Sequence, residues 1–515
     1  MKGAVAAGHS ETATCAADIL RDGGNAFDAV VAAHLVACVS EPVLSSLGGG
    51  GFLLAKKSTA TPVLYDFFAQ TPLEKSPETT GSFYKISADF GTVTQDFRIG
   101  PGSVAVPGTV KGLFNIHEEL CTMPLSRLAE PAITLARNGV EMNAFQADIF
   151  RIVKPIYEVN SEVKKHYSNQ ISGGLFVEGE LFKRPLFADF LENLHKEGSK
   201  LFYEGEIAKA IREVCSVSGG HITAKDLRNY RVIKRNPIRS EAFNHIVYIN
   251  PPPSSGGILV AFALKLCEKI GIQKHDPWSI GFVKKVAEVQ RIVNKARLEL
   301  LLNNQGKNPD TDLLDEELLE IYRNEVLQNF SSERGTTHIS VADGNGNLAS
   351  LTTSNGEGSG VMIPGTSIML NNMLGESDLF PGGVGSWTPN CRISSMMAPG
   401  LLQLDNGTEI VFGSGGSNRI RTAILQVLLK ISAYEIGIED AVNHPRIHIE
   451  EEILNIEGGF DRLIVEQLKN LFTESKIWQN KSLFFGGVHV VSRSSRGEFT
   501  GCGDPRRGGI FMTVE

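Results

Sequence analysis

The pattern of apolar and polar residues changes along the chain. Apolar residues recur at helical spacing over 10–20 and 25–39, where Ser10 can cap the first helix and Gly23-Gly24 can end it. Helical spacing returns at 128–138 and 207–214, within a mainly helical stretch from 101 to 240. A short strand at 246–249 and a proline-rich turn precede another apolar helix at 258–267. We therefore expect the chain before residue 335 to be rich in helices.

Strand patterns dominate from Thr336 onward. Residues 336–342 alternate, Asp343-Gly344-Asn345-Gly346 is a strong hairpin signal, and 347–354 form the returning strand. Residues 367–371 and 409–412 are expected to continue the sheet. The turn 413–417 then opens a helix with its apolar face at Ile420, Ile424, Val427, Leu428 and Ile431. A polar stretch over 303–334 comes just before this change, and its end, 329–334, predicts an exposed linker.

Four consecutive glycines, Gly48 to Gly51, precede an apolar strand that starts near Phe52. Such a run is costly in chain entropy, so it suggests that the backbone approaches a ligand or another segment closely. A plain flexible turn explains the same residues, and the run alone leaves both interpretations open.

Composition narrows the class of protein. Of the 515 residues, 42% are hydrophobic and 21% charged, and the net charge of −8 with scattered Lys and Arg favours neither nucleic acid nor a membrane. Seven cysteines without a CxxC spacing argue against a disulfide framework or a zinc site. The apolar stretch 26–43 is interrupted by Asp28, His34 and Glu41, which indicates a buried helix rather than a membrane span. Because residues 1–9 look like a strand and not a signal peptide, we expect a cytoplasmic protein, or a periplasmic or secreted one if a leader has been lost.

Thr336 is the first candidate for chemistry. If the chain were cut between Gly335 and Thr336, the threonine would gain a free amino group beside its own hydroxyl, so that a nucleophile and a base would share one residue. An α-amino group has an ordinary pKa of about 7.7–8.0 and can accept the hydroxyl proton near neutral pH. Gly335 suits the cut because it has no side chain to hinder attack on its carbonyl. Locally, the two threonines are equally well explained as strand formers.

Two further segments carry candidate groups. The turn Gly413-Ser414-Gly415-Gly416-Ser417 joins a strand to a helix, so several backbone N–H groups can point at one spot and stabilise an oxyanion. The same geometry could hold phosphate or be a simple tight turn. Ser394 and Ser395 offer two adjacent hydroxyls that could bind a carboxylate, although a structural role explains them as well.

Taken in order, these segments resemble the γ-glutamyltranspeptidase family of N-terminal-nucleophile hydrolases over nearly the whole chain. The quoted matches are joined by others at 23–29, 104–110, 202–205, 226–230, 251–257, 370–372 and 503–509. The resemblance implies a four-layer αββα fold of the α+β class. It also implies a precursor cut into a large subunit, 1–335, and a small subunit, 336–515, which stay together as one intertwined unit. A heterotetramer of two processed chains is a further expectation, and no cofactor or metal is implied.

The resemblance also assigns roles. Thr336 matches the nucleophile, Gly415 and Gly416 match the oxyanion-hole amides, and Ser394 with Ser395 matches the pair that holds the α-carboxylate of the donor. Ser354 lies where the family has a threonine that supports the nucleophile, and Asn355 matches a nearby asparagine in a loop that is shorter here. Glu376 could receive the α-amino group of a donor.

Two departures from the family pattern concern the donor. Phe68 replaces the arginine that clamps the α-carboxylate, and Met373 stands where the family has glutamine. The leading hypothesis is an autoprocessed amidohydrolase or acyltransferase that acts on γ-glutamyl compounds such as glutathione, by hydrolysis or by transfer to an amine. The alternatives are an acylase-type enzyme with a non-glutamyl donor, and an uncleaved, non-catalytic binding protein.

Overall fold

The computed structural model describes residues 1–76, 83–89, 94–217, 219–303, 314, 335–376, 379–380, 385–450 and 453–515. Within these ranges helices and sheets are mixed, which confirms the predicted α+β class. None of the helices in these ranges is long and apolar enough to cross a membrane. The predicted linker at 329–334 lies outside the described residues.

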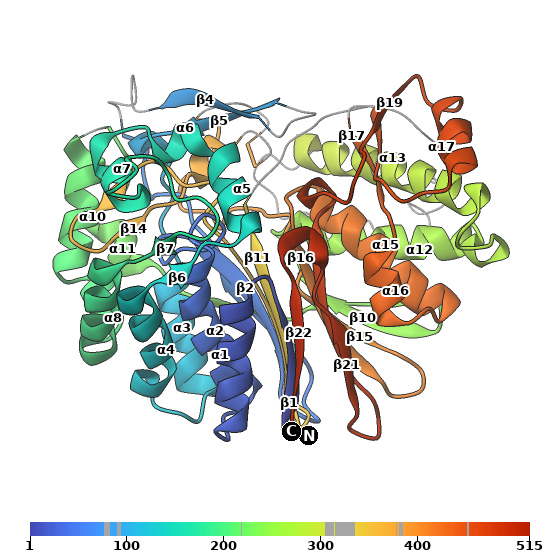
Figure 1. Cartoon of the computed structure of the whole chain (residues 1–515), viewed down its shortest axis with the longest axis horizontal. Coiled ribbons are helices and arrows are strands. Elements are labelled where there is room, and N and C mark those ends of the chain that lie inside the picture. Colours follow the sequence, from blue (N-terminus) through green and yellow to red (C-terminus); the bar gives the residue numbers. More distant parts are fainter. Residues whose placement is uncertain are drawn as a thin grey trace.

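The larger sheet has the strand order β22-β1-β11-β12-β2-β3-β8, and all its neighbours are antiparallel. Gly3 pairs with Asp343 on one side and with Val514 on the other, so the first strand lies between the strand after Thr336 and the last strand. Figure 1 accordingly shows the two chain ends side by side. The strands are β1 (Gly3–Ala7), β2 (Gly50–Lys56), β3 (Val63–Phe67), β8 (Ile233–Arg235), β11 (Thr337–Asp343), β12 (Leu348–Ser354) and β22 (Ile510–Val514).

The second sheet is also antiparallel and has the order β21-β20-β16-β15-β10-β9. It packs against the first sheet, because β11 contacts both β16 and β20 and β12 contacts β16. Its strands are β9 (Ile238–Ala242), β10 (His245–Ile249), β15 (Gly400–Gln403), β16 (Glu409–Gly415), β20 (Gly487–Arg493) and β21 (Phe499–Cys502). Each sheet thus takes strands from both sides of residue 335.

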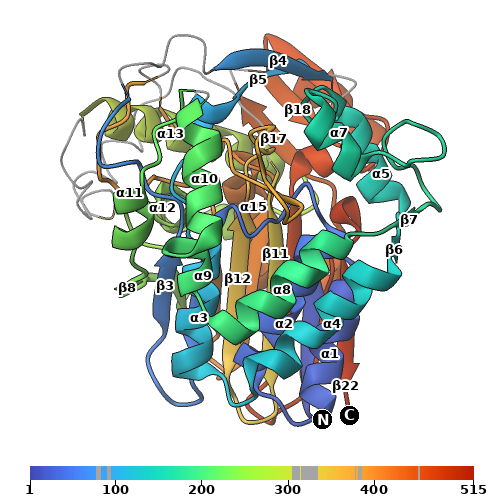
Figure 2. The same cartoon turned by 90° about the vertical axis from the view of Figure 1, so that its left-hand side faces the viewer.

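Helices cover the outer sides of the two sheets (Figures 1 and 2). On the larger sheet lie α1 (Ser10–Arg21), α2 (Ala26–Ser40) and α3 (Thr109–Leu120), backed by α4 (Leu125–Asn138) and α8 (Pro185–Glu197). On the second sheet lie α12 (Ser255–Lys269) and α15 (Arg419–Tyr434), with α13 (Ile280–Asn303) behind them. The smaller helices are α5 (Ala144–Ile152), α6 (Lys154–Tyr157), α7 (Ser161–Tyr167), α9 (Lys200–Tyr203), α10 (Glu206–Val217), α11 (Ala224–Asn229), α16 (Ile438–Asn443) and α17 (Arg462–Lys469).

Short strand pairs complete the fold. They are β4 (Tyr84–Asp89) with β5 (Thr94–Ile99), β6 (Val140–Glu141) with β7 (Leu181–Phe182), β13 (Met362–Ile363) with β14 (Ile368–Met369), and the three-stranded group β17 (Ile447–Glu450), β18 (Ile453–Ile456) and β19 (Glu474–Ile477).

Several predictions about elements need correction. The cap of α1 is His9, whose ring accepts the N–H of Glu11, because the backbone is still extended at His9 and Ser10 is already helical. Residues 367–371 do not continue the main sheet, since β14 pairs only with β13. The strand predicted at 409–412 belongs to the second sheet and not to that of Thr336. The predicted apolar face of α15 is also too narrow, because residues 419–432 are buried on every side.

The glycine run Gly48 to Gly51 is explained by close packing against other segments. A Cβ on Gly48 would lie 2.5 Å from the carbonyl oxygen of Met369, and one on Gly49 would lie 2.3 Å from that of Ser354. These distances are below van der Waals contact, so only glycine fits. The run leads directly into β2, which pairs with β12, so it lies at the end of the strand that carries Ser354.

Candidate active site

Thr336 lies one residue before β11, is 3% exposed, and lines a small cavity near the ends of both sheets. The cavity has a volume of about 20 Å³ in the uncut chain, room for about one water molecule. Its lining combines six apolar and five polar residues: Phe68, Thr336, Ser354, Met373, Glu376, Leu379, Ser395, Met396, Met397, Ser417 and Ile420. Five of the residues predicted from sequence, Phe68, Thr336, Ser354, Glu376 and Ser395, therefore lie around the same cavity.

The peptide bond before Thr336 is held by hydrogen bonds. The Ser354 hydroxyl donates to the carbonyl oxygen of Gly335 at 2.6 Å and accepts the N–H of Gly356 at 3.0 Å. On the other side, the N–H of Gly335 donates to the Glu357 carboxyl group at 2.8 Å. A hydroxyl that donates to the carbonyl oxygen polarises it and favours attack on its carbon. The sequence predicted Ser354 as a support of Thr336, but nothing in it indicated a role for Glu357.

The glycine turn after β16 packs against Thr336. A Cβ on Gly415 would lie 2.2 Å from the carbonyl oxygen of Thr336, so this close approach requires glycine. Gly416 has a φ of +120°, and Ser417, with a φ of +54°, lines the cavity. The structure thus brings the predicted oxyanion-hole turn to the predicted nucleophile.

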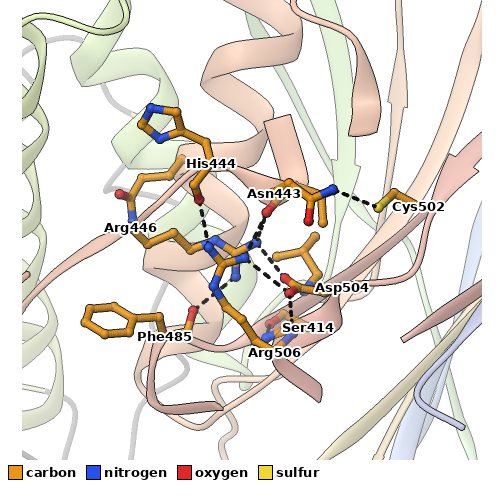
Figure 3. A network of polar contacts seen from close by, with 12 residues as sticks. Ser414, Asn443, His444, Arg446, Phe485, Cys502, Asp504 and Arg506 are labelled. Carbon is orange, nitrogen blue, oxygen red and sulfur yellow. Dashed lines mark hydrogen bonds and ion pairs between the residues drawn. The ribbon is translucent and has the colours of Figure 1, made fainter. Parts of the chain in front are cut away.

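Arg507, which lies 171 positions after Thr336 in the sequence, contacts it. Its guanidinium donates to the carbonyl oxygen of Thr336 at 3.4 Å. The adjacent residues are anchored by a buried ion network, in which Arg446 and Arg506 converge on Asp504 at 2.6 and 3.2 Å (Figure 3). Burial alone would raise the pKa of Asp504, but the two guanidinium groups outweigh it and lower this pKa to about 2. The network therefore fixes the loop that carries Arg507.

Glu41 contacts the residue that follows the nucleophile. The Thr337 hydroxyl donates to its carboxyl group at 2.7 Å, and the Thr12 hydroxyl donates at 3.1 Å. Burial raises the pKa of Glu41 to about 7, although these hydrogen bonds and the charge of Arg507 act in the opposite direction. Neither Glu41 nor Arg507 was predicted as a site residue from the sequence. Arg507 lies in a segment that matches the family, but nothing marked the residue itself, and no motif linked Glu41 to Thr336.

The remaining predicted binding residues are placed differently. Ser395 lines the cavity, whereas Ser394 is half-buried beside it and donates to Ser255 at 3.5 Å. Asn355 is fully buried and donates to the carbonyl oxygen of Met369 at 3.4 Å, without lining the cavity.

Phe68 forms part of the cavity wall and is held there by aromatic packing. Its ring stacks on Phe52 with centroids 5.3 Å apart, and the side chain is 2% exposed. The nearby guanidinium of Arg392 donates to the backbone carbonyl of Phe68 and to the Tyr230 hydroxyl, and lies 3.5 Å from Asp66. Arg392 is therefore engaged behind the cavity wall, and none of the lining residues that the structure describes is a lysine or an arginine.

Two curated proteins and one solved structure are similar to this chain over nearly its whole length. Glutathione hydrolase proenzyme of Escherichia coli is 28% identical over 541 residues, covering 98% of this chain and 90% of the relative. Acylase ACY 1 proenzyme of a Pseudomonas strain is 27% identical, covering 100% of this chain and 94% of the relative. The solved cephalosporin acylase from Bacillus halodurans has the same fold, with a TM-score of 0.85 at 23% identity, covering 100% of this chain and 96% of that one.

The family Gamma-glutamyltranspeptidase matches residues 12–514, which is nearly the whole chain and includes every residue of the cavity. The chain therefore belongs to the γ-glutamyltranspeptidase family, a family of amidohydrolases and acyltransferases.

Proposed function

We propose that this chain cuts itself between Gly335 and Thr336, and that Thr336 then cleaves an amide substrate through an acyl-enzyme. The observation that carries the proposal is how the peptide bond between Gly335 and Thr336 is held. The Gly335 carbonyl, hydrogen-bonded by Ser354 at 2.6 Å, adjoins a threonine that faces a cavity shared with Glu376 and Ser395. The relatives named as proenzymes support processing of this kind.

The chemistry runs in two stages. In self-cleavage the Thr336 hydroxyl oxygen bonds to the Gly335 carbonyl carbon, the carbon–nitrogen bond breaks, and the hydroxyl proton ends on the freed nitrogen. Water then hydrolyses the ester and leaves a carboxylate on Gly335. In turnover the new α-amino group takes the hydroxyl proton as Thr336 attacks the substrate carbonyl, and the amine departs with that proton. We assign the oxyanion in this second stage to the backbone amides of Gly415 and Gly416.

The proposal includes the family arrangement of the parts. Residues 1–335 and 336–515 would form the large and small subunits, layered as helices, sheet, sheet and helices. The packing of β11 on β16 and β20, and of α2 and α15 on the outer sides, supports this layering. A heterotetramer of two processed chains remains an expectation from the family.

Two classes of acyl donor fit the proposal. A γ-glutamyl donor such as glutathione is the family substrate, and Ser395 and Glu376 could hold its carboxylate and amino groups. An acylase-type donor is favoured by a specific observation, because Phe68 and several methionines line the cavity and no cation among the described lining residues faces it. A free α-carboxylate would then lack its usual charged partner. We therefore propose the acylase-type donor as the second candidate.

Denaturing electrophoresis tests self-cleavage. The purified protein should give two bands, with a new N-terminus at Thr336, and Thr336→Ala should give one band of full length. Mass spectrometry of the wild type incubated with amide donors should then locate the acyl group on Thr336. A single full-length band in the wild type would contradict autoprocessing and favour the non-catalytic binding protein.

A further inference from the structure

We propose that Glu357 is a positioning residue for self-cleavage, which together with Ser354 holds Gly335 in the reactive conformation and selects glycine at this site. This inference rests on the proposed function, since it concerns the cut before Thr336. It assigns to Glu357 a role that neither the sequence motifs nor the turnover chemistry requires.

The contacts restrain Gly335 at both of its polar groups. Its N–H donates to Glu357 at 2.8 Å, and its carbonyl oxygen accepts the Ser354 hydroxyl at 2.6 Å. These groups belong to the two successive peptide units that flank the Gly335 α-carbon. Glycine has more backbone freedom than any other residue, so an unrestrained Gly335 would sample many orientations of the scissile carbonyl. Holding both units in one orientation keeps the carbonyl carbon available to the Thr336 hydroxyl.

Glu357 is itself held rigidly for this task. Its backbone N–H donates to the Asn372 side chain at 3.1 Å, and the residues on either side of it, Gly356 and Gly358, have φ angles of +63° and +94°. A Cβ on Gly356 would lie 1.9 Å from the side-chain oxygen of Asn372, so the turn tolerates only glycine there. The Glu357 side chain is 2% exposed. A buried carboxyl group is costly unless it is hydrogen-bonded, and the backbone of Gly335 supplies one such bond.

The same loop restricts which residue can precede the cut. A Cβ on Gly335 would lie 2.8 Å from the carbonyl oxygen of Gly356, closer than real contacts allow. A larger residue at 335 would therefore displace the turn that carries Glu357. The loop 354–358 thus recognises the site in two ways, by hydrogen bonds to its backbone and by excluding a side chain.

Cleavage kinetics of the full chain test the role of Glu357. Radiolabelled protein is made by cell-free synthesis, and the conversion of the full-length band is followed after a chase. We expect Glu357→Ala to slow the first-order rate by about 10-fold or more, the effect of losing a hydrogen bond that holds Gly335 in place in the transition state. Glu357→Gln keeps a carbonyl acceptor and should restore most of the rate. Gly335→Ala should also be slow.

Glu180→Ala is the matched control. Glu180 also accepts a loop backbone N–H, that of Val177 at 3.0 Å, but this bond does not involve Gly335, so its loss should leave the rate unchanged. Melting curves of Thr336→Ala with and without Glu357→Ala, both uncut, separate slow cleavage from misfolding. If the double variant melts much lower, Glu357→Gln decides, because a Gln variant as slow as Ala would overturn the positioning role.

The outcomes distinguish the two proposals. A wild type that stays full-length, like Thr336→Ala, contradicts the proposed function itself. A wild type that cuts, beside a Glu357→Ala variant that cuts at the same rate, overturns only the role of Glu357. Wild-type cleavage in Gly335→Ala would likewise show that the loop does not select the residue before the cut.

Discussion

Phe68 is the residue at which we predict a departure from the usual family pattern, with an aromatic ring in place of a guanidinium. The ring is stacked on Phe52 and 2% exposed. The nearby Arg392 does not line the cavity, and its guanidinium is engaged by the Phe68 carbonyl, Tyr230 and Asp66. The part of the cavity wall that Phe68 forms is therefore apolar.

Donor preference follows from this wall. We expect the processed wild type to hydrolyse a γ-glutamyl anilide with a kcat/KM roughly 10- to 100-fold below that of a relative that has the arginine, since a charge-assisted hydrogen bond to the α-carboxylate is missing. Phe68→Arg should raise kcat/KM for the γ-glutamyl substrate while lowering the free energy of unfolding by about 3 kcal/mol, because a buried aromatic ring is lost and a charge is introduced. Phe68→Leu is the control that keeps an apolar wall. Fast γ-glutamyl turnover by the wild type would mean that another cation serves the donor.

At the residue scale, the sequence predicted those site residues that belong to a recognisable motif. Thr336 and the glycine turn follow short patterns whose chemistry is local, whereas Ser354 was predicted from its place in the family resemblance. The structure brings these residues together. Glu41 and Glu357 could not be found in this way. Glu41 lies 296 positions from its partner Thr337, and the contact of Glu357 with Gly335 depends on a loop that only the folded chain shapes.

At the scale of elements, the end of α2 is tied to the start of β11. Glu41, at the end of α2, accepts hydrogen bonds from the hydroxyls of Thr337 and Thr12. Burial raises the pKa of Glu41 to about 7. The apolar spacing of α1 and α2 and the glycines between them made their positions predictable from sequence, although the cap of α1 is His9 and not the predicted Ser10. Sheet membership was not predictable, as β14 and β16 demonstrate, because pairing depends on partners far along the chain.

The raised pKa of Glu41 predicts a pH-dependent stability. The folded-state pKa of about 7 exceeds the ordinary value of 4.5, so folding favours the protonated group. Its contribution to the free energy of unfolding is greatest below pH 4.5, and roughly 3 kcal/mol of it is lost as the pH rises to 7. In the uncut Thr336→Ala background, Glu41→Gln should remove this slope in chemical denaturation between pH 4.5 and 8. Parallel curves for the two proteins would contradict the assignment, and Glu118→Gln, on the surface of α3, is the control.

At the scale of the whole molecule, the two segments flanking residue 335 are interleaved. β1 and β2 pair with β11 and β12, and β10 pairs with β15 across the second sheet. Neither segment can complete a sheet alone. A cut between Gly335 and Thr336 therefore breaks one covalent bond and leaves these strand pairs in place.

Interleaving predicts that the processed pieces stay together. We expect them to elute as one peak in size-exclusion chromatography in native buffer, and to separate only in denaturant. Native mass spectrometry should give the summed mass of both pieces, which equals the mass of the uncut chain plus one water. Separate elution of the two pieces without denaturant would show that the paired strands do not hold them.

The position of β1 has a consequence for how the protein is made. β1 (Gly3–Ala7) is synthesised long before β11 and β22, the strands with which it pairs. Until β11 has been made, both edges of this strand lack those partners, and unpaired edges are where nascent chains aggregate. Contacts so distant in sequence also make folding slow. The sheet around Thr336 can therefore be complete only after β22 has been synthesised, so we expect the proposed cut to occur late.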